Sequence, residues 1–173
     1  GITKHLRRGV HRQMVADVPL GAFLSGGLDS SSIVAFAREV NPDIRCFSIE
    51  TQGRQDKGVI DDLPYAKRVA KHLNVSLEIV TIESHKIATD LESMVVQLDE
   101  PLADPAALNV LYISRLAKDQ GVKVLLSGAG GDDLFTGYRR HYALQLERYW
   151  TWLPKSSRVF LENLTKNLNT TNY

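Results

Sequence analysis

A glycine-rich loop with hydroxyl and carboxylate side chains is the part of this sequence best suited to chemistry. It runs from Ser25 to Ser32, includes Gly26, Gly27 and Asp29, and follows a short apolar run. The glycines let the backbone turn sharply and lie close to a ligand, and the polar residues after them are types that open helices. Because the start of a helix is a favourable place for phosphate, the loop predicts a phosphate-binding site.

Asp29 indicates that this phosphate comes with a metal ion. A carboxylate beside a phosphate is unfavourable unless a cation lies between them, and Mg²⁺ with oxygen ligands is the usual bridge. We therefore expect a metal-bound nucleotide rather than a bare anion. A plainer interpretation stays open, in which Asp29 or Ser30 only caps a helix and the glycines form an ordinary turn.

A second glycine-rich loop with acidic residues spans 127–138 and follows the apolar run 122–126. It begins with Ser127 and Gly128 and carries Asp132 and Asp133 after further glycines. In open sheets of parallel strands, ligands bind beyond the carboxyl ends of the strands. The two loops are therefore expected to serve one site.

The elements that must position these loops alternate between strand and helix. We predict strands over 20–24, 44–49, 75–82 and 122–126, and helices over 2–16, 61–73, 84–98 and 106–119, with another helix after the first loop. Polar residues 50–58 are expected to form an exposed loop, and Pro154 separates two expected helices within 138–168. This order predicts an α/β fold with an open parallel sheet sandwiched by helices.

Composition places the chain in the ordinary soluble class. Its 173 residues are 43% hydrophobic and 24% charged. With 21 Lys and Arg against 20 Asp and Glu, the net charge of +1 gives no case for a nucleic-acid partner. No apolar stretch is long enough to span a bilayer. The single cysteine, Cys46, is interpreted as a small buried residue and agrees with a cytoplasmic location.

Two charged segments leave their roles open. The helix expected over 2–16 has apolar residues at helical spacing with five basic residues between them, namely Lys4, Arg7, Arg8, His11 and Arg12. A solvated face is the plain interpretation, and phosphate steering or docking to a neighbouring domain are the alternatives. Asp99, Glu100 and Asp104 lie in a segment with two prolines, which could hold a metal or a substrate ammonium group, or form a structural turn.

The loop from Ser25 to Ser30 resembles the PP-loop of the ATP pyrophosphatases, which split ATP into AMP and pyrophosphate while adenylating a substrate. Together with the segments 18–24, 99–101 and 126–138, it is similar to the synthetase domain of the glutamine-hydrolysing asparagine synthetases. The similarity covers residues 4 to 150. It implies a PP-loop fold, ATP and Mg²⁺ as cofactors, a small carboxylate substrate that is aspartate in the parent family, and ammonia from an N-terminal glutaminase domain.

The resemblance also implies site residues. It places the pyrophosphate loop on Ser25, Gly26, Gly27, Asp29 and Ser30, and the contacts to adenosine, mostly through backbone, on Phe23, Ile49, Ser127 and Gly128. Asp29 and Asp132 match the carboxylates expected to hold Mg²⁺. In the implied reaction a substrate carboxylate attacks the α-phosphorus of ATP, and ammonia then displaces AMP. No protein nucleophile is required.

One departure from the family pattern bears on the product. Ala129 stands where the family commonly has an acidic residue, while Asp133 in place of a glutamate and Thr136 in place of a glycine are milder changes. A related synthetase that makes a lactam or another amide is therefore an alternative. A non-catalytic module that binds adenine nucleotides is a third hypothesis, from a different class.

We expect the chain to be a fragment of a longer enzyme. The glutaminase domain and the later helical region that supplies a lysine in the family are not within these residues. Residues 1–153 are predicted to form the nucleotide-binding synthetase domain, and 154–173 the start of a truncated helical region. A homodimer is left open.

Overall fold

The structure, a computed structural model, describes residues 1–52, 62–100, 102, 106–135, 139–147, 149 and 152–159. The elements in chain order are α1 (Ile2–Gln13), β1 (Leu20–Phe23), α2 (Leu28–Val40), β2 (Arg45–Gln52), α3 (Leu63–Leu73), β3 (Ser76–Glu83), α4 (Ser84–Gln97), α5 (Ala106–Asp119), β4 (Val124–Leu126), α6 (Gly131–Phe135) and α7 (Arg139–Glu147). They fall into two compact units, Gly1–Ala129 and Gly130–Tyr173. Within the described part of the chain, no helix is both long and apolar enough to cross a membrane.

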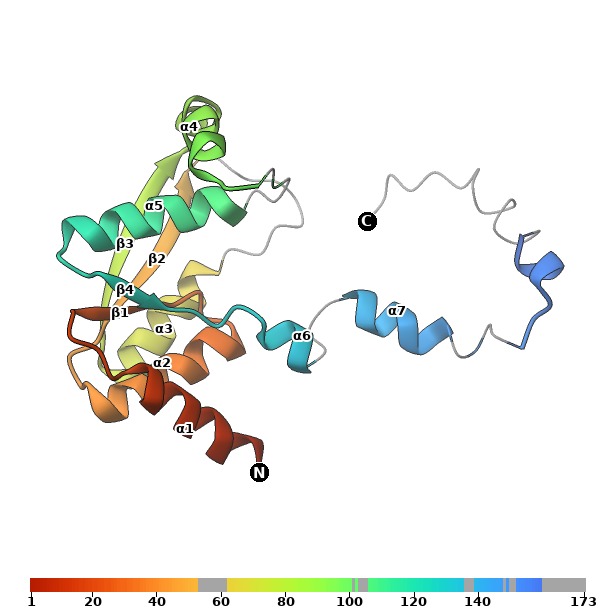
Figure 1. The fold of residues 1–173 in the computed structure, drawn as a ribbon, viewed down its shortest axis with the longest axis horizontal. Helices are drawn as coiled ribbons and strands as arrows, with labels where there is room; N and C mark the ends of the chain where they lie inside the picture. The colour runs from red at the N-terminus through yellow and green to blue at the C-terminus, as the bar shows by residue number, and fades with distance from the viewer. Residues whose placement is uncertain are drawn as a thin grey trace. The chain divides into compact units, whose positions relative to one another are not determined.

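The first unit is built on a parallel sheet of four strands in the order β3-β2-β1-β4 (Figure 1). Ala22 of β1 pairs with Cys46 of β2 on one side and with Leu126 of β4 on the other. The chain moves outward from β1 through β2 to β3 and then returns to the opposite side of β1 as β4. This reversal of strand order lies between β1 and β4, where open sheets of this kind bind ligands.

Helices cover both faces of the sheet, which confirms the predicted sandwich. Alternate strand residues point to opposite faces. On one face, Ala22 and Cys46 join a core formed with α1, α2 and α3. On the other face, Phe47 packs with α5 residues that include Ile113 and Ala117. α4 packs against α5, and the Tyr112 hydroxyl of α5 donates a hydrogen bond to the Asp90 carboxylate of α4 at 2.6 Å.

Cys46 is a buried core residue, as predicted. Its side chain is fully covered and the thiol is free. Burial raises the pKa of the Cys46 thiol to about 12 because the charged thiolate would lose its hydration. At neutral pH this cysteine is therefore a small apolar residue rather than a nucleophile.

α1 is amphipathic, as its spacing predicts, but its first apolar position is not covered. Val10 and Met14 are buried and Leu6 packs against the same core, whereas Ile2 is 66% exposed. The helix therefore rests on the core through its later turns. Arg7 adds a contact, since its guanidinium lies 5.2 Å from the centre of the Phe36 ring of α2.

Two of the predicted boundaries that differ from the structure are set by contacts between elements. β2 continues to Gln52 rather than ending before Glu50, because Glu50 to Gln52 stay paired with β3 as far as Glu83. The remainder of the expected loop, 53–58, lies outside the described residues. β4 begins at Val124 rather than Val122, whose N–H donates to the Ala117 carbonyl and completes the end of α5.

The second unit contains α6 and α7. The predicted second loop is not irregular throughout, because residues 131–135 form the short helix α6, with Asp132 and Asp133 in its first turn. Acidic residues are favourable at that position of a helix. α7 ends at Glu147, and the chain after Val159 lies outside the described residues. The boundary between predicted domains 1–153 and 154–173 stays a prediction.

Candidate functional site

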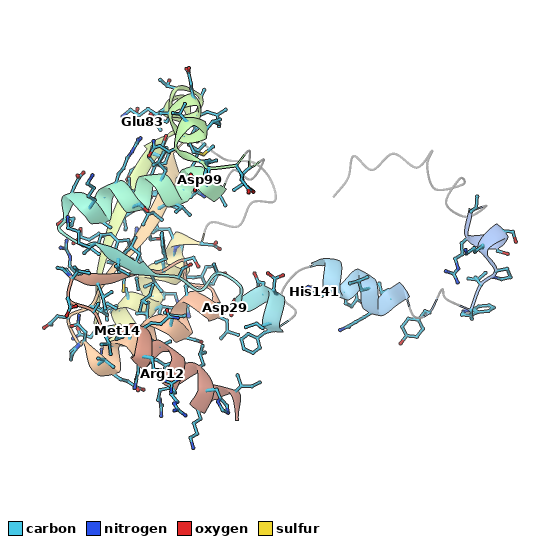
Figure 2. The ribbon with its side chains drawn as sticks, in the orientation of Figure 1. Arg12, Met14, Asp29, Glu83, Asp99 and His141 are labelled. Carbon is cyan, nitrogen blue, oxygen red and sulfur yellow. The ribbon has the colours of Figure 1, made fainter. Side chains whose placement is uncertain are left out.

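The first glycine loop joins the end of β1 to the start of α2, in the predicted order of strand, turn and helix. The Leu24 N–H still donates to the Phe47 carbonyl of β2 at 2.9 Å. Gly26 then takes a φ of 86°, a left-handed conformation that favours glycine, and Gly27 forms the N-cap of α2. Figure 2 shows Asp29 at the start of this helix.

Two serine hydroxyls hold the loop in this shape. Ser30 is a buried residue, 7% exposed, and its hydroxyl donates to the Gly27 carbonyl at 3.3 Å. It also lies 3.0 Å from the Ser25 hydroxyl. Because a hydroxyl has one proton, Ser25 is then the donor in that pair, and its oxygen accepts from the Gly27 N–H at 3.4 Å. Both hydroxyl protons are thus used inside the loop.

The groups that this geometry offers to an anion are therefore backbone amides. The first N–H groups of an α-helix have no partner within the helix. In α2 these belong to Leu28, Asp29 and Ser30, since the first helical bond runs from the Ser31 N–H to the Gly27 carbonyl. They lie at the positive end of a helix of 13 residues, where negative charge is favourable.

Asp29 does not serve as a helix cap. The N-cap residue is Gly27, and no side chain caps α2 by a hydrogen bond. The plain interpretation, in which Asp29 or Ser30 only caps the helix, is therefore wrong. A metal-binding role for the Asp29 carboxylate stays a prediction. Within the described ranges no group of three or more His, Cys, Asp or Glu side chains could hold a metal. Mg²⁺ commonly takes one or two carboxylates, with phosphates and water as the other ligands.

Gly26 packs against the start of α3, a contact that could not be predicted from the sequence. A Cβ atom at Gly26 would lie 2.6 Å from the Tyr65 carbonyl carbon and still closer to the Ala66 amide nitrogen. The loop is thus supported by a helix that begins almost forty residues later. Tyr65 and Ala66 carry no motif that would reveal this role, because any residue type can supply a backbone surface.

Gly128 brings the second loop into contact with the first. A Cβ atom at Gly128 would lie 2.8 Å from the Ser30 amide nitrogen and 3.0 Å from the Asp29 carbonyl carbon. Only glycine allows this approach. The loop itself is shaped by Ser127, whose hydroxyl accepts the Ala129 N–H at 3.1 Å. The two loops therefore meet at Gly128, and that they serve one site stays a prediction.

Neither backbone conformation nor packing within the protein requires a glycine at position 27. Its φ of −67° is accessible to every residue type, and a Cβ atom there would meet only the Ser25 hydroxyl at 3.5 Å, an ordinary contact. Gly26 and Gly128, in contrast, are needed for packing. A bound ligand lying close to the backbone would account for glycine at position 27.

The other predicted site residues lie in several places. Phe23 and Ile49 are partly buried on the face of the sheet covered by α5, near Phe47. Asp132 is exposed in the first turn of α6 and belongs to the second unit, so its pairing with Asp29 stays a prediction. Asp99 and Glu100 are exposed, whereas Asp104 lies outside the described residues.

The parallel sheet, with a glycine loop at the start of α2 and a second loop against it, defines an α/β protein with the PP-loop fold. A solved structure supports this class. U34-tRNA thiolase NcsA from Methanococcus maripaludis superposes with a TM-score of 0.54 at 19% identity, covering 88% of this chain and 54% of the thiolase. At this identity the likeness shows the fold alone.

Sequence comparison then narrows the class to a family. The family model described as asparagine synthase matches residues 1–172, and the chain belongs to this family. It is 40% identical over 129 residues to asparagine synthetase [glutamine-hydrolyzing] 1 of Bacillus subtilis, covering 75% of this chain and 20% of that protein. It is 35% identical over 167 residues to a putative asparagine synthetase of Mycobacterium bovis, covering 96% of this chain and 25% of that protein. The chain thus spans a fifth to a quarter of the length of these relatives.

Proposed function

We infer that this chain is the nucleotide-binding part of an ATP-dependent synthetase that adenylates a carboxylate, releases pyrophosphate and forms an amide with ammonia. If the reaction is the one that the names of its relatives give, the carboxylate is that of aspartate, the product is asparagine and the ammonia comes from glutamine. The observation that carries this proposal is the packing of Gly128 against Ser30 and Asp29. It joins two predicted loops at the reversal point of the sheet, where a nucleotide is expected.

The loop would act mainly by charge and position. The amides at the start of α2 would stabilise the negative charge of the departing pyrophosphate. Ser25, Ser30 and the Gly26 turn hold these amides in place beforehand, so little rearrangement is needed during the reaction. The substrate carboxylate itself attacks the α-phosphorus. The protein therefore has to orient the two reactants and need not supply a nucleophile.

Adenosine would lie beyond the strand ends, against Phe23 and Ile49 on one side and the backbone of Ser127 and Gly128 on the other. Asp29, with Asp132 from the second glycine loop, would hold Mg²⁺. Bound there, the ion would neutralise charge on the pyrophosphate. Asp29 fits this role because it lies in the first turn of α2 without acting as its cap.

The test is to identify what is released from ATP. The whole polypeptide that contains this chain would be incubated with MgATP, aspartate and ammonium chloride. We expect AMP, pyrophosphate and asparagine in equal amounts, and replacement of ammonium by glutamine should preserve the reaction. Asp29→Asn should abolish pyrophosphate release, whereas Asp43→Asn, which changes an exposed carboxylate after α2, should not. Release of orthophosphate in place of pyrophosphate would contradict the proposal.

A second candidate product rests on Ala129. This residue is exposed in the second loop, and its side chain can neither accept a proton nor bind an amine. A synthetase that makes a lactam or a different amide would keep the adenylation step and change the acceptor. Pyrophosphate release that depends on another carboxylate and yields no asparagine from aspartate would favour this product.

A further inference from the structure

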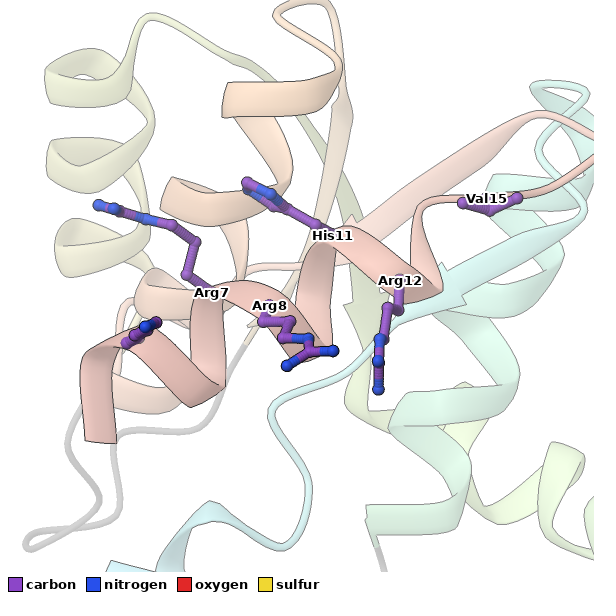
Figure 3. A pocket seen from close by; sticks show the side chains of 6 residues that line it. Arg7, Arg8, His11, Arg12 and Val15 are labelled. Carbon is purple, nitrogen blue, oxygen red and sulfur yellow. The ribbon is translucent and has the colours of Figure 1, made fainter. Parts of the chain in front are cut away.

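The outer face of α1 carries a row of basic side chains at regular helical spacing. Lys4, Arg8 and Arg12 are four residues apart, so each lies about 6 Å further along the helix axis than the one before. Together with Arg7, His11 and Val15 they line an open pocket of about 490 Å³, shown in Figure 3. Of the 21 Lys and Arg residues four lie in α1, which contains no Asp or Glu.

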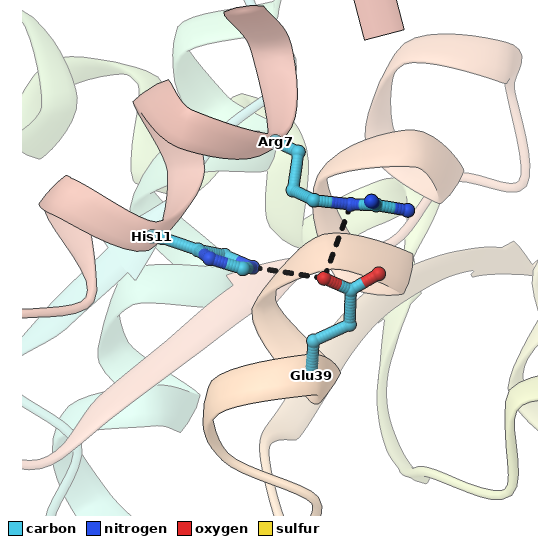
Figure 4. Close-up of polar contacts among 3 residues, drawn as sticks. All are labelled: Arg7, His11 and Glu39. Atoms are coloured by element: carbon cyan, nitrogen blue, oxygen red, sulfur yellow. Dashed lines mark hydrogen bonds and ion pairs between the residues drawn. The ribbon is translucent and has the colours of Figure 1, made fainter. Parts of the chain in front are cut away.

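One half of this face already binds a carboxylate. Arg7 Nε lies 3.2 Å and His11 Nε2 3.0 Å from the same oxygen of Glu39, at the end of α2 (Figure 4). Two basic residues four apart thus hold one carboxylate between them. The contact joins α1 to α2, as does the burial of Val10 and Met14 in one core with Val34 and Ala37 of α2.

Arg8 and Arg12 form a second pair of basic residues four apart, each one position after its counterpart in the pair Arg7 and His11. They have the same spacing as Arg7 and His11, yet within the ranges that the structure describes neither forms an ion pair. Like charges four residues apart destabilise a helix slightly unless an opposite charge lies between them. Val15, three residues beyond Arg12, is 85% exposed and adds an apolar contact at the end of the row.

We propose that this face of α1 binds an acidic helix of a protein partner, with one carboxylate held between Arg8 and Arg12, a second near Lys4, and an apolar side chain on Val15. Carboxylates four residues apart on the partner would match the spacing of the cations. Each contact would resemble the one that Arg7 and His11 make with Glu39. The proposal concerns a surface separate from the glycine loops and does not depend on the product of the reaction.

Charge favours a protein partner over a nucleic acid or a membrane. Without the four basic residues of α1, the chain has 17 basic and 20 acidic residues, a net charge of −3. A large polyanion would therefore be repelled by most of the molecule. Protein–DNA complexes commonly neutralise about 6–10 phosphates, which is more than this row of three cations can contact.

The proposal is tested with two labelled helical peptides and the full chain. The first peptide has glutamates four residues apart and a leucine three residues after the last glutamate, and the second has the same composition with its glutamates adjacent. Fluorescence anisotropy at low salt should show that the first binds more tightly. Arg8→Gln with Arg12→Gln should weaken its binding about fivefold, the loss expected for two exposed ion pairs.

A matched control separates a shaped site from general positive charge. Lys67 and Lys71 are exposed, four residues apart on α3, and their double change to glutamine removes the same charge. We expect this variant to bind the first peptide within about twofold of the unchanged chain. Equal losses in both double variants, equal binding of both peptides, or no binding would overturn the proposal. So would tighter binding to duplex RNA or to phosphatidylserine vesicles.

Discussion

Substitution of Gly128 by alanine tests whether the two loops must touch. The added Cβ atom would lie 2.8 Å from the Ser30 amide nitrogen, whereas an ordinary contact begins at 3.4 Å. The two backbones must therefore separate by about 0.6 Å, the difference between these distances. Neither partner is a flexible side chain, so the shift has to be taken up by the loops themselves.

Two effects of known size follow for Gly128→Ala. Overpacking of this kind lowers the free energy of unfolding by about 1–3 kcal/mol. The shift would move the Asp29 and Ser30 amides, and losing one hydrogen bond to a charged phosphate costs about 1.5–3 kcal/mol, so we expect the affinity for MgATP to fall at least about tenfold. Unfolding in urea would measure the first effect, and calorimetry with MgATP the second.

Gly9→Ala is the matched control, because it adds the same atom where nothing lies within 4 Å. Gly9 lies inside α1, where alanine is more favourable by about 0.5–1 kcal/mol. This variant should be slightly more stable and should bind MgATP unchanged. If Gly128→Ala binds MgATP as tightly as the unchanged chain, the contact between the loops does not position the site and our reasoning is refuted.

Three further predictions concern single residues. Gly27→Ala should change the free energy of unfolding by less than about 1 kcal/mol, since its Cβ has room, yet weaken MgATP binding in calorimetry; equal affinity would mean that no ligand approaches this backbone. Asp29→Asn should remove most of the increase in ATP affinity that Mg²⁺ produces, measured with and without EDTA, and a preserved increase would exclude Asp29 as a metal ligand. Burial raises the pKa of Cys46 from 9.0 to about 12, so the folded protein retains the thiol proton that the unfolded chain releases. The resulting stability is fully present below pH 9 and is lost as pH rises towards 12. Cys46→Val should flatten this decline in urea unfolding from pH 8.5 to 10.5, and an unchanged slope would argue against the shift.

The fold could be predicted because its signals are local. Short apolar runs bounded by glycine or proline indicated four strands, and their alternation with helical spacing indicated a parallel sheet. Errors arose where pairing or capping between elements decided the boundary. Glu50 looked like the start of a loop, but its pairing with Thr81 keeps it in β2. Val122 looked like strand, but its N–H completes the end of α5.

For the candidate site, the sequence indicates the residue types, and the structure decides how these residues bond to one another. Ser25 and Ser30 were expected among the ligand-binding residues, yet their hydroxyl protons are engaged within the loop. Asp29 was left with two interpretations, and the N-cap at Gly27 removed one of them. Spacing shows which side chains a loop contains, whereas hydrogen bonds among them depend on the turn that the loop takes.

By itself, the sequence determined the order of the elements, the two loops and the kind of chemistry they suit, because these depend on residues close together in the chain. Only the tertiary structure decided that Gly26 rests on the start of α3 and Gly128 on the first turn of α2. These contacts join residues 40 and about 100 positions apart, so no local pattern encodes them. They depend on the strand order, which places β4 beside β1.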